Sequence, residues 1–466
     1  MNLKQLSCVV LLAASMAAQD PVVQFGSASP ADSAPSTRIS TIGAPRVGNA
    51  DFALRLEGAQ PSSNAFLLLS SGHDSLVVEN LEFLIELGPE AVCLGPIPVD
   101  ADGVAECPLP IDPSESLLGT QLVAQWVSQN SLASSGLEST RAVRLTVVSS
   151  EFRLFVSTSG ELQLRDEGGE LDSFSFSTPN SSSTLAVRAD GRVAAVGLVE
   201  PNATPQIRWF EVGTSTLTDR GATPISGTVV QVAIHPVTGE LYSYSGQGGL
   251  SPSVFTVRSF ESDPDAQNFM AQTNEIEVIG GLGVSMGFSP SGDQLILASA
   301  FSFQVIDTDP DSETNGEVVL TRTTNLQGFG IVSASGETFF TLPVFSTELL
   351  EFGVATGVQV GATTLADDPG LFGTITRAPG GELAIVRAPG TEIFFFDPIP
   401  PAGAPRVTSL PNPRAIGFLT GVEFSLDGAR VFGFAGIDLV ELDRATAIEV
   451  VTPTTVTGTV SGLAVR

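Results

Sequence analysis

The sequence predicts an all-β protein in which a small β-sandwich domain precedes a seven-bladed β-propeller. Short apolar segments alternate with turn residues. The 466 residues include 47 glycines and 31 prolines, more residues that interrupt secondary structure than a helical protein tolerates. From residue 149 onward a unit of about 45 residues recurs, and each unit contains several short strands. Four strands in a repeat of that length are typical of a propeller blade.

The composition limits the classes of function. The chain carries 51 acidic residues, 21 basic residues and 2 histidines, a formal charge of −30, and 42% of its residues are hydrophobic. So apolar a chain can bury large cores and is not disordered throughout. Its negative charge repels phosphate backbones and anionic lipids, so we expect no nucleic-acid partner and no membrane insertion. The acidic surface either keeps the protein soluble or attracts cations, and both interpretations stay open.

The N-terminus has the pattern of a secretory signal peptide, which we assign to residues 1–18. The start MNLKQ is basic, LSCVVLLAASMA follows as a short apolar run, and small residues allow cleavage after Ala17 or Ala18. Cys8 precedes most of that run, whereas a lipidated cysteine would have to follow it. We therefore expect a secreted protein, extracellular or periplasmic. Residues 19–44 are rich in Ser, Ala and Pro and are predicted to be a linker.

Residues 45–148 are predicted to form the β-sandwich, because six or so short strands fall within about 100 residues. The segment 91–111 reads as a hairpin that turns at Asp102-Gly103. Its two arms carry Cys93 and Cys107, the only cysteines left after signal cleavage. In an exported chain such a pair is expected to form a disulfide, here one that staples the hairpin.

The repeats of residues 149–466 share one turn. In each repeat an apolar strand leads into a Ser/Pro/Asp-Gly turn and a second apolar strand, as in MGFSPSGDQLILAS (286–299). Glycine at this point supplies the positive φ of a tight turn. Intervals of 48, 53, 44, 45 and 47 residues separate the six turn glycines, Gly191, Gly239, Gly292, Gly336, Gly381 and Gly428.

The blade count follows from the length of this region. Its 318 residues give about 45 per blade for seven blades, whereas six would need 53 and eight only 40. Residues 152–167 read as the second and third strands of a blade without a first strand, and VSGLAVR (460–466) reads as a first strand with nothing after it. We therefore predict that the last strand pairs beside residues 152–158 and closes the ring.

The repeats resemble the YVTN-type and Trp-Asp-type propeller families. The residues that carry the resemblance are FSPSG (288–292), FSLDG (424–428), HPVTG (235–239), EFGVATG (351–357) and ELDRATA (441–447). No blade contains the Trp-Asp dipeptide, and the shared residues make turns, so the resemblance indicates a fold more than a function. The segment 117–131 looks like N-terminal modules of secreted bacterial proteins.

Few residues in this sequence suggest catalysis. With two histidines and no free cysteine expected, Cys–His catalysis and histidine-rich zinc sites are excluded, and the chain has neither a GxSxG nor a GxxxxGK[ST] motif. His235 stands where sister repeats carry Ser, so we interpret it as a turn residue. His73 is expected in a loop.

The segment IDTDPDSETNGE (306–317) is the best candidate for a metal site. Asp307, Asp309 and Asp311 alternate, and carboxylates at every second position can converge on one calcium ion. The spacing departs from a calcium-binding loop of the EF type, which needs Gly at its sixth position and Glu at its twelfth. A solvated acidic loop at the rim is the alternative interpretation.

Some propellers that these repeats resemble are lactonases that use a bound metal or acidic residues at the central channel. The resemblance therefore implies that acids near the inner strands could serve a lactonase site, and the candidates are Asp190, Asp293, Asp367, Asp368, Glu423 and Asp427. Asp190 and Asp427 precede turn glycines, a position that turn formation alone explains.

The function that the sequence favours is a secreted, non-catalytic binding or scaffolding protein, since a full set of propeller repeats comes without a catalytic constellation. We expect a monomer that binds a protein or carbohydrate ligand and no cofactor besides the calcium considered above. A lactonase-like hydrolase and a cell-surface adhesion component are the alternatives.

Overall fold

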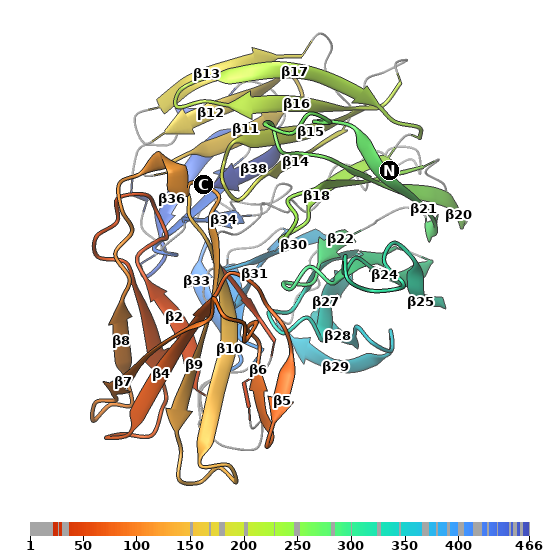
Figure 1. Ribbon diagram of the computed structural model, residues 1–466. Coiled ribbons are helices and arrows are strands. Elements are labelled where there is room, and N and C mark those ends of the chain that lie inside the picture. The colour runs from red at the N-terminus through yellow and green to blue at the C-terminus, as the bar shows by residue number, and fades with distance from the viewer. Residues whose placement is uncertain are drawn as a thin grey trace.

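The computed structural model is nearly all β and has two parts (Figure 1). Residues 22–148, here called the module, lie beside a ring of sheets formed by residues 152–465. Among the described residues, no helix is long and apolar enough to cross a bilayer. The described residues are 22–26, 28–29, 37–149, 152–166, 169–176, 182–199, 204–227, 229–246, 252–280, 285–299, 301–323, 328–343, 346–365, 372–378, 381–388, 392–398, 405–412, 422–425, 428–435, 437–446, 449–450, 454–456 and 460–465.

Within these ranges the ring consists of seven four-stranded antiparallel sheets. The first comprises β38 (Val460–Val465), β11 (Leu154–Thr158), β12 (Glu161–Asp166) and β13 (Gly169–Ser175). The second comprises β14 (Ser182–Val187), β15 (Val193–Val199), β16 (Gln206–Val212) and β17 (Leu217–Pro224). The third comprises β18 (Val229–Ile234), β19 (Leu241–Gly246), β20 (Ser253–Phe260) and β21 (Gln272–Gly280). The fourth comprises β22 (Ser285–Phe288), β23 (Gln294–Ala298), β24 (Ser302–Asp307) and β25 (Val318–Thr323).

The remaining three sheets have the same order of strands. The fifth comprises β26 (Gly328–Val332), β27 (Thr338–Pro343), β28 (Glu348–Gly353) and β29 (Gln359–Thr364). The sixth comprises β30 (Phe372–Arg377), β31 (Leu383–Ala388), β32 (Glu392–Phe396) and β33 (Val407–Pro411). The seventh comprises β34 (Val422–Phe424), β35 (Arg430–Ala435), β36 (Asp438–Asp443) and β37 (Thr454–Thr455).

The first sheet joins distant parts of the chain. β38 pairs antiparallel with β11, so that Leu154 lies opposite Val465 and Val156 opposite Leu463. This is the pairing that the sequence predicted for its last strand. Because β38 also contacts β14 on one side and β34 on the other, the innermost strands of the seven sheets form a closed circle.

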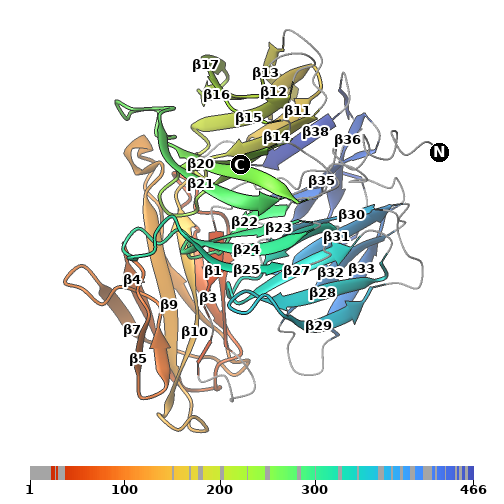
Figure 2. The ribbon, with the colours of Figure 1, turned by 90° about the vertical axis from the view of Figure 1, so that its right-hand side faces the viewer.

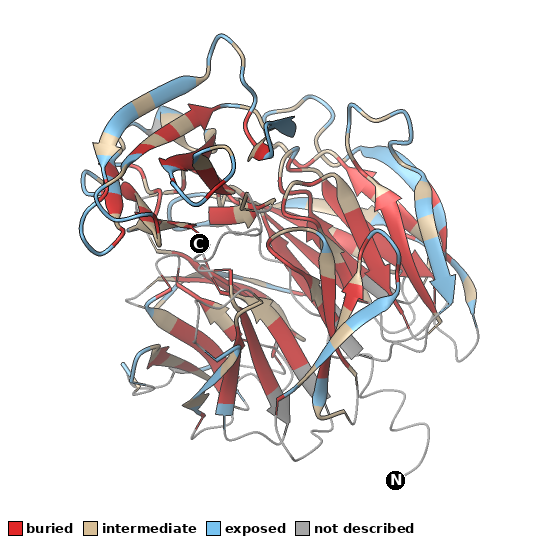
Figure 3. Ribbon diagram, turned by 90° about the horizontal axis from the view of Figure 1, so that it is seen from below, coloured by how far each residue is buried: buried red, intermediate tan, exposed pale blue. Residues whose placement is uncertain are grey.

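The cores of the ring lie between neighbouring sheets. Phe155 of the first sheet packs with Leu185 and Phe210 of the second, and each further pair of neighbours, up to the seventh and first sheets, shares a core of its own. Second strands such as β15 are buried along almost their whole length, whereas the outermost strands alternate between buried and exposed residues. Figure 3 shows this change from the buried inner strands to the exposed outer ones.

The shared turn has the conformation that the sequence predicted. All six turn glycines, from Gly191 to Gly428, have φ between 69° and 90°. At Gly292 a Cβ atom would come within 2.6 Å of the His235 ring, so a side chain is excluded there by space as well as by conformation.

Two sheets of the module share one apolar core. The larger comprises β1 (Val22–Phe25), β10 (Leu137–Thr146), β9 (Gln121–Gln129), β4 (Asn64–Ser70) and β7 (Val92–Pro98). The smaller comprises β2 (Arg38–Ile42), β3 (Ala53–Glu57) and β8 (Ala105–Pro108). Leu54 and Leu56 of the smaller sheet pack against Leu67 and Trp126 of the larger. A hairpin of β5 (Leu76–Val78) and β6 (Leu81–Phe83) and a 3-10 turn at Glu115–Leu117 complete the module.

The structure corrects the predicted linker of residues 19–44. Residues 22–25 form β1 and pair with β10, and residues 38–42 form β2 and pair with β3. The buried side chains of Val22, Phe25 and Ile39 explain why these short segments are held in sheets. The predicted signal peptide, residues 1–18, lies outside the described residues.

The structure also corrects the predicted hairpin of residues 91–111. Its two arms belong to different sheets, with β7 beside β4 and β8 beside β3. Cys107 faces the shared core and is buried, whereas Cys93 is exposed, and both are free thiols in the structure. The proposed disulfide therefore does not join them here, since Cys107 lies in the core on β8 and Cys93 is exposed on β7 of the other sheet.

The module lies against one face of the ring, as Figures 1 and 2 both show. This face carries the turns between the first and second strands of the sheets. Of the five consecutive turns from the second to the sixth sheet, four have close contacts with the module, between Gly119 and Asp190, Gln121 and Val237, Arg144 and Pro290, and Gln24 and Gly381. The turn of the fifth sheet interacts with the module through the charges of Glu337 and Arg141.

Candidate functional site

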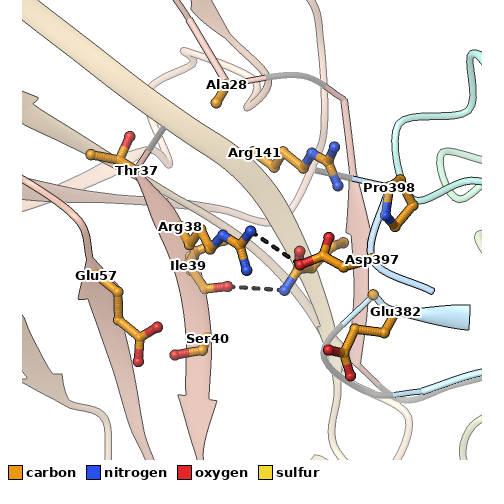
Figure 4. A pocket seen from close by; sticks show the side chains of 12 residues that line it. Ala28, Thr37, Arg38, Ile39, Ser40, Glu57, Arg141, Glu382, Asp397 and Pro398 are labelled. Carbon is orange, nitrogen blue, oxygen red and sulfur yellow. Dashed lines mark hydrogen bonds and ion pairs between the residues drawn. The ribbon is translucent and has the colours of Figure 1, made fainter. Parts of the chain in front are cut away.

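A cavity of about 270 Å³ lies between the module and the ring (Figure 4). Strands β1, β2, β3 and β10 supply its module side, and the turn before β31 and the end of β32 supply its ring side. The residues that line it are Gln24, Ala28, Thr37, Arg38, Ile39, Ser40, Glu57, Arg141, Gly381, Glu382, Asp397 and Pro398. Both parts of the protein are therefore needed to form this site.

A β-bulge positions Arg141. Ser139 and Ala142 of β10 are three residues apart, yet they pair with Val127 and Gln125 of β9, which are only two apart. One extra residue is thus inserted into β10, and such an insertion redirects a side chain out of the regular alternation. The hydroxyl of Thr140 bonds to the carbonyl of Arg141 at 2.7 Å and accepts a bond from the Trp126 amide at 3.1 Å, so the bulge keeps its polar groups satisfied.

An ion pair crosses the cavity. The Nη2 atom of Arg38 donates to Asp397 Oδ2 at 3.2 Å, which links β2 of the module to the end of β32. Figure 4 shows the Arg38 and Arg141 side chains both turned toward Asp397. The other two lining carboxylates also have arginine partners outside the cavity lining. Glu382 pairs with Arg444, and Glu57 lies 3.4 Å from Arg55.

Arg141 differs from these arginines. In the described part of the chain its guanidinium has no hydrogen bond or ion pair at contact distance. Burial lowers the pKa of Arg141, the charges of Asp397 and Glu337 oppose that shift, and the charge of Arg38 adds to it. Because an arginine pKa begins far above neutral, the group stays cationic. The cavity therefore holds one cation without a direct counter-charge.

A second polar network fixes the junction beside the cavity. The Arg144 guanidinium donates to the carbonyls of Pro290 at 2.9 Å and Ser291 at 3.3 Å, and its Nη2 also lies 3.3 Å from His73 Nδ1. Arginine can only donate, so His73 Nδ1 accepts and its Nε2–H donates to Asp293 Oδ1 at 3.4 Å. Burial lowers the pKa of Arg144 to about 10, and the charge of Asp293 opposes this shift.

His73 and Asp293, two residues singled out from the sequence, thus meet at the junction. Burial acts to raise the pKa of Asp293, but hydrogen bonds from His73 and Ser291 and the charge of Arg144 outweigh it and leave that pKa below its ordinary value. A low pKa suits a carboxylate that holds the two parts together, since it stays charged.

In the acidic segment 306–317, two carboxylates accept hydrogen bonds from the segment itself. Asp307 Oδ2 accepts hydrogen bonds from the hydroxyls of Ser312 and Thr314, and Asp307 Oδ1 accepts one from the Asp309 amide at 3.0 Å. Asp309 Oδ1 in turn accepts the Asp311 amide at 3.0 Å. The carboxylates of Asp307 and Asp309 thus accept hydrogen bonds from the loop's own donors.

The structure does not bring Asp307, Asp309 and Asp311 together around a common centre. Among the described residues, no group of three or more His, Cys, Asp or Glu side chains has an arrangement that could hold a metal ion. The calcium ion considered above stays a prediction.

His235 has the structural role that its turn position indicated. It is 1% exposed, and its Nδ1 accepts the amides of Val237 and Thr238, each at 3.1 Å. In sister turns the hydroxyls of Ser289 and Ser333 also accept an amide, in their case that of the residue five positions on, Gln294 and Thr338. Burial lowers the pKa of His235 to about 4, and the charge of Arg144 acts in the same direction.

The remaining acidic candidates do not form one site. Asp190 is buried and pairs with Arg188 at 3.0 Å, in keeping with its role in the turn. Glu423 lies on β34, in another sheet. Asp367, Asp368 and Asp427 lie outside the described residues.

The arginines of the junction are not among the residues predicted from the sequence. Its available signal was the segment RAVRLTVV (141–148), in which Arg141 and Arg144 interrupt an apolar strand of an arginine-poor chain. Cationic residues inside such a strand are rarely buried without a partner. The partners of Arg144 in the ring, Pro290 and Ser291, lie more than a hundred residues away, so the sequence alone could not name them.

Comparisons with known proteins indicate which folds this chain is similar to. No family model matches the chain, and no curated protein matches it. A structure named a putative 6-phosphogluconolactonase, from Bacteroides fragilis NCTC 9343, is 15% identical, covers 68% of this chain and 98% of its own, and superposes with a TM-score of 0.51.

Two more solved structures are similar to the chain, each 14% identical with a TM-score of 0.49. One bears the same enzyme name and comes from Bacteroides uniformis ATCC 8492, covering 68% of this chain and 100% of its own. The other, a functionally unknown protein from Desulfotomaculum acetoxidans DSM 771, covers 68% and 99%. The Bacteroides fragilis likeness and the sheets described above show that this chain has an all-β, propeller-like fold.

Proposed function

We propose that the protein is an exported binding protein whose ligand occupies the cavity between the module and the ring. The observation that supports this is the cavity itself, which is built from both parts and lined by polar side chains. Small-molecule sites lie preferentially where two domains meet, because each side supplies some of the groups that orient the ligand. Among the described carboxylates that the sequence singled out, Asp190, Asp293 and Asp307 are engaged in a turn, the junction and a loop, which favours binding over catalysis.

The experiment that tests this proposal is a calorimetric titration with small molecules of different charge, in the native protein and in a variant with a filled cavity. Ser40 lines the cavity, so Ser40→Phe is expected to abolish binding. Ser173→Phe, on the exposed outer strand β13, is the matched control and is expected to bind normally. Binding that survives Ser40→Phe would place the ligand elsewhere and contradict the proposal.

Lactone hydrolysis is the second candidate function. It is favoured by the fold likeness to the Bacteroides fragilis protein, although that likeness extends to the fold alone. The test is proton release from sugar lactones by the native protein and by the double variant Asp367→Asn, Asp368→Asn. Turnover that the double variant loses would establish a hydrolase, whereas equal background rates would leave the binding proposal standing.

A further inference from the structure

We propose that the cavity takes a small organic monocarboxylate, held by the guanidinium of Arg141, and that this ligand ties the module to the ring. The inference rests on the proposed function and names its ligand class. It is carried by Arg141, a cation that a β-bulge presents to the cavity and that has no direct counter-charge among the described residues.

The charges around the cavity favour an anion. Asp397 is neutralised by Arg38, Glu382 by Arg444 and Glu57 by Arg55. Arg141 has no ion-pair partner of its own among the described residues, although the charges of Asp397 and Glu337 act on it, so its guanidinium is open to an added carboxylate. In a chain of formal charge −30, which repels anions as a whole, a largely buried cation without an ion-pair partner is unusual. A cationic ligand would be repelled by the charge of Arg141, and a neutral ligand would leave the Arg141 charge without an ion-pair partner.

The same charges favour a single carboxylate over a phosphate. A monoanion balances Arg141, whereas a second negative charge would come close to the carboxylates of Asp397 and Glu382. Guanidinium is planar and presents two parallel donors, the geometry that a carboxylate accepts in bidentate fashion. The cavity, at about 270 Å³, lies just below the usual range of ligand sites, so it suits a small ligand.

The rest of the ligand meets polar groups from both parts of the protein. Residues 38 and 40 lie on the same face of β2, because side chains alternate along a strand, and Ile39 between them turns into the core. Among the described residues the Ser40 hydroxyl makes no hydrogen bond, and it lines the cavity. A hydroxylated ligand can therefore bond to Ser40 while its carboxylate faces Arg141. Since Asp397 and Glu382 come from the ring, such a ligand touches both parts.

The experiment is a calorimetric titration of the full-length mature protein with sodium glucuronate, glucose and glucosamine, which carry a carboxylate, a neutral group and an ammonium group on similar rings. Sodium succinate and sodium sulfate are added to separate sugar acids, other carboxylates and inorganic anions. Variants Arg141→Gln and Arg141→Lys are compared with Arg220→Gln, a change of the same charge on the exposed outer strand β17. Hydrogen exchange with and without glucuronate then locates the site.

We expect saturable binding of at least one carboxylate, no binding of glucose or glucosamine, and protection of both β2 and the segment 381–388 in hydrogen exchange. Loss of a charge-assisted hydrogen bond predicts that Arg141→Gln weakens binding about tenfold to a hundredfold. The affinity of Arg141→Lys is expected to lie between those of Arg141→Gln and the native protein, because lysine keeps the charge but lacks the two parallel donors. Arg220→Gln is expected to bind as tightly as the native protein.

Four results would overturn the inference. Carboxylate binding unchanged in Arg141→Gln, or no carboxylate binding together with binding of glucose or glucosamine that Ser40→Phe abolishes, contradicts the ligand class while the proposed function survives. Sulfate binding as tight as carboxylate binding contradicts the preference for a planar monoanion. If none of the probes binds, both the inference and the proposed function fail.

Discussion

The guanidinium of Arg144, on β10 of the module, donates to the main-chain carbonyl of Pro290, in a turn of the fourth sheet, at 2.9 Å. Pro290 belongs to the Ser-Pro-Ser-Gly turn that marks the repeat in the sequence. The turns that define the fold are therefore also the surface on which the module rests. The Arg144 guanidinium lies over the Phe25 ring at 5.2 Å, so the cation is held by an aromatic face as well as by oxygen atoms.

Replacing Arg144 is expected to loosen the junction. Arg144→Met keeps much of the side-chain volume but leaves the Pro290 and Ser291 carbonyls without their donor, at a cost of about 3 kcal/mol. Differential scanning calorimetry of the variant should show the module melting before the ring. Arg220→Met, whose ion pair with Glu211 is exposed, should cost less than about 1 kcal/mol. Equal effects of the two changes would show that the Arg144 contacts do not couple the parts.

The stability of the ring should depend on pH through His235. Its pKa is about 4 in the folded protein and near 6.5 when unfolded, so the unfolded chain takes up more protons between these values. The stabilisation is complete above about pH 6.5 and is lost as the pH falls, by about 2 kcal/mol at about pH 5. His235→Ser, with the residue of the sister turns, should remove this part of the pH dependence. Denaturant titrations at about pH 6.5 and about pH 5 give the free energy of unfolding of both proteins. An equal loss of this free energy in the two proteins would contradict the assignment.

Calcium should leave the thermal midpoint unchanged, because the carboxylates of Asp307 and Asp309 already accept hydrogen bonds from the amides and hydroxyls of their own loop. Binding to the folded state at a hundred times the dissociation constant would add about 2.7 kcal/mol, a shift that a melt detects. Asp307→Ala should instead destabilise the protein by about 1–2 kcal/mol through the lost hydrogen bonds. A calcium-specific rise that Asp307→Ala abolishes would establish a metal site in this loop.

The two cysteines of the module should react differently with a thiol reagent. Cys93 is exposed and should be modified in the native protein, whereas Cys107 should react only after unfolding. Burial also raises the pKa of Cys107, which lowers the fraction of reactive thiolate. The measurement is thiol titration with and without denaturant. If the unfolded, unreduced protein shows no thiols at all, the disulfide predicted from the sequence would be present.

Closing of the ring by β38 should make a large contribution to stability. Leu463 is 0% exposed and packs in the core between the seventh and first sheets. Leu463→Ala should therefore destabilise the protein by about 2–5 kcal/mol. Leu132→Ala, in an exposed loop of the module, is the control and should have almost no effect. A small loss at Leu463 would mean that the first sheet is stable without its inner strand.

The repeats were predictable because their signal is local. A positive φ at Gly191 or Gly292 depends on residues within one turn, and sequence periodicity reports it directly. The pairing of β11 with β38 could also be inferred, because the repeat at residues 152–167 lacked a first strand and residues 460–466 formed a first strand with no repeat after it. Residues 22–25 were missed because four residues between polar stretches give no periodic pattern.

The site was less predictable because its parts are distant in sequence. The direction of the Arg141 side chain depends on a bulge that only pairing with β9 creates. The ion pair of Arg38 with Asp397 joins residues from opposite ends of the chain. His235 could be assigned to a turn because its sister positions are visible in the sequence, whereas His73 has no sister position and its partners appeared only in the folded chain.

The shared first sheet also sets the order of events during synthesis. A ribosome makes β11 long before β38, so the inner edge of β11 has no strand to pair with until residues 460–465 have been made. An edge of this kind recruits other strands, including those of neighbouring chains. The newly made protein therefore passes through a stage that is vulnerable to aggregation. A chaperone that covers residues 154–158 until β38 has been made would protect the edge that is most exposed to aggregation.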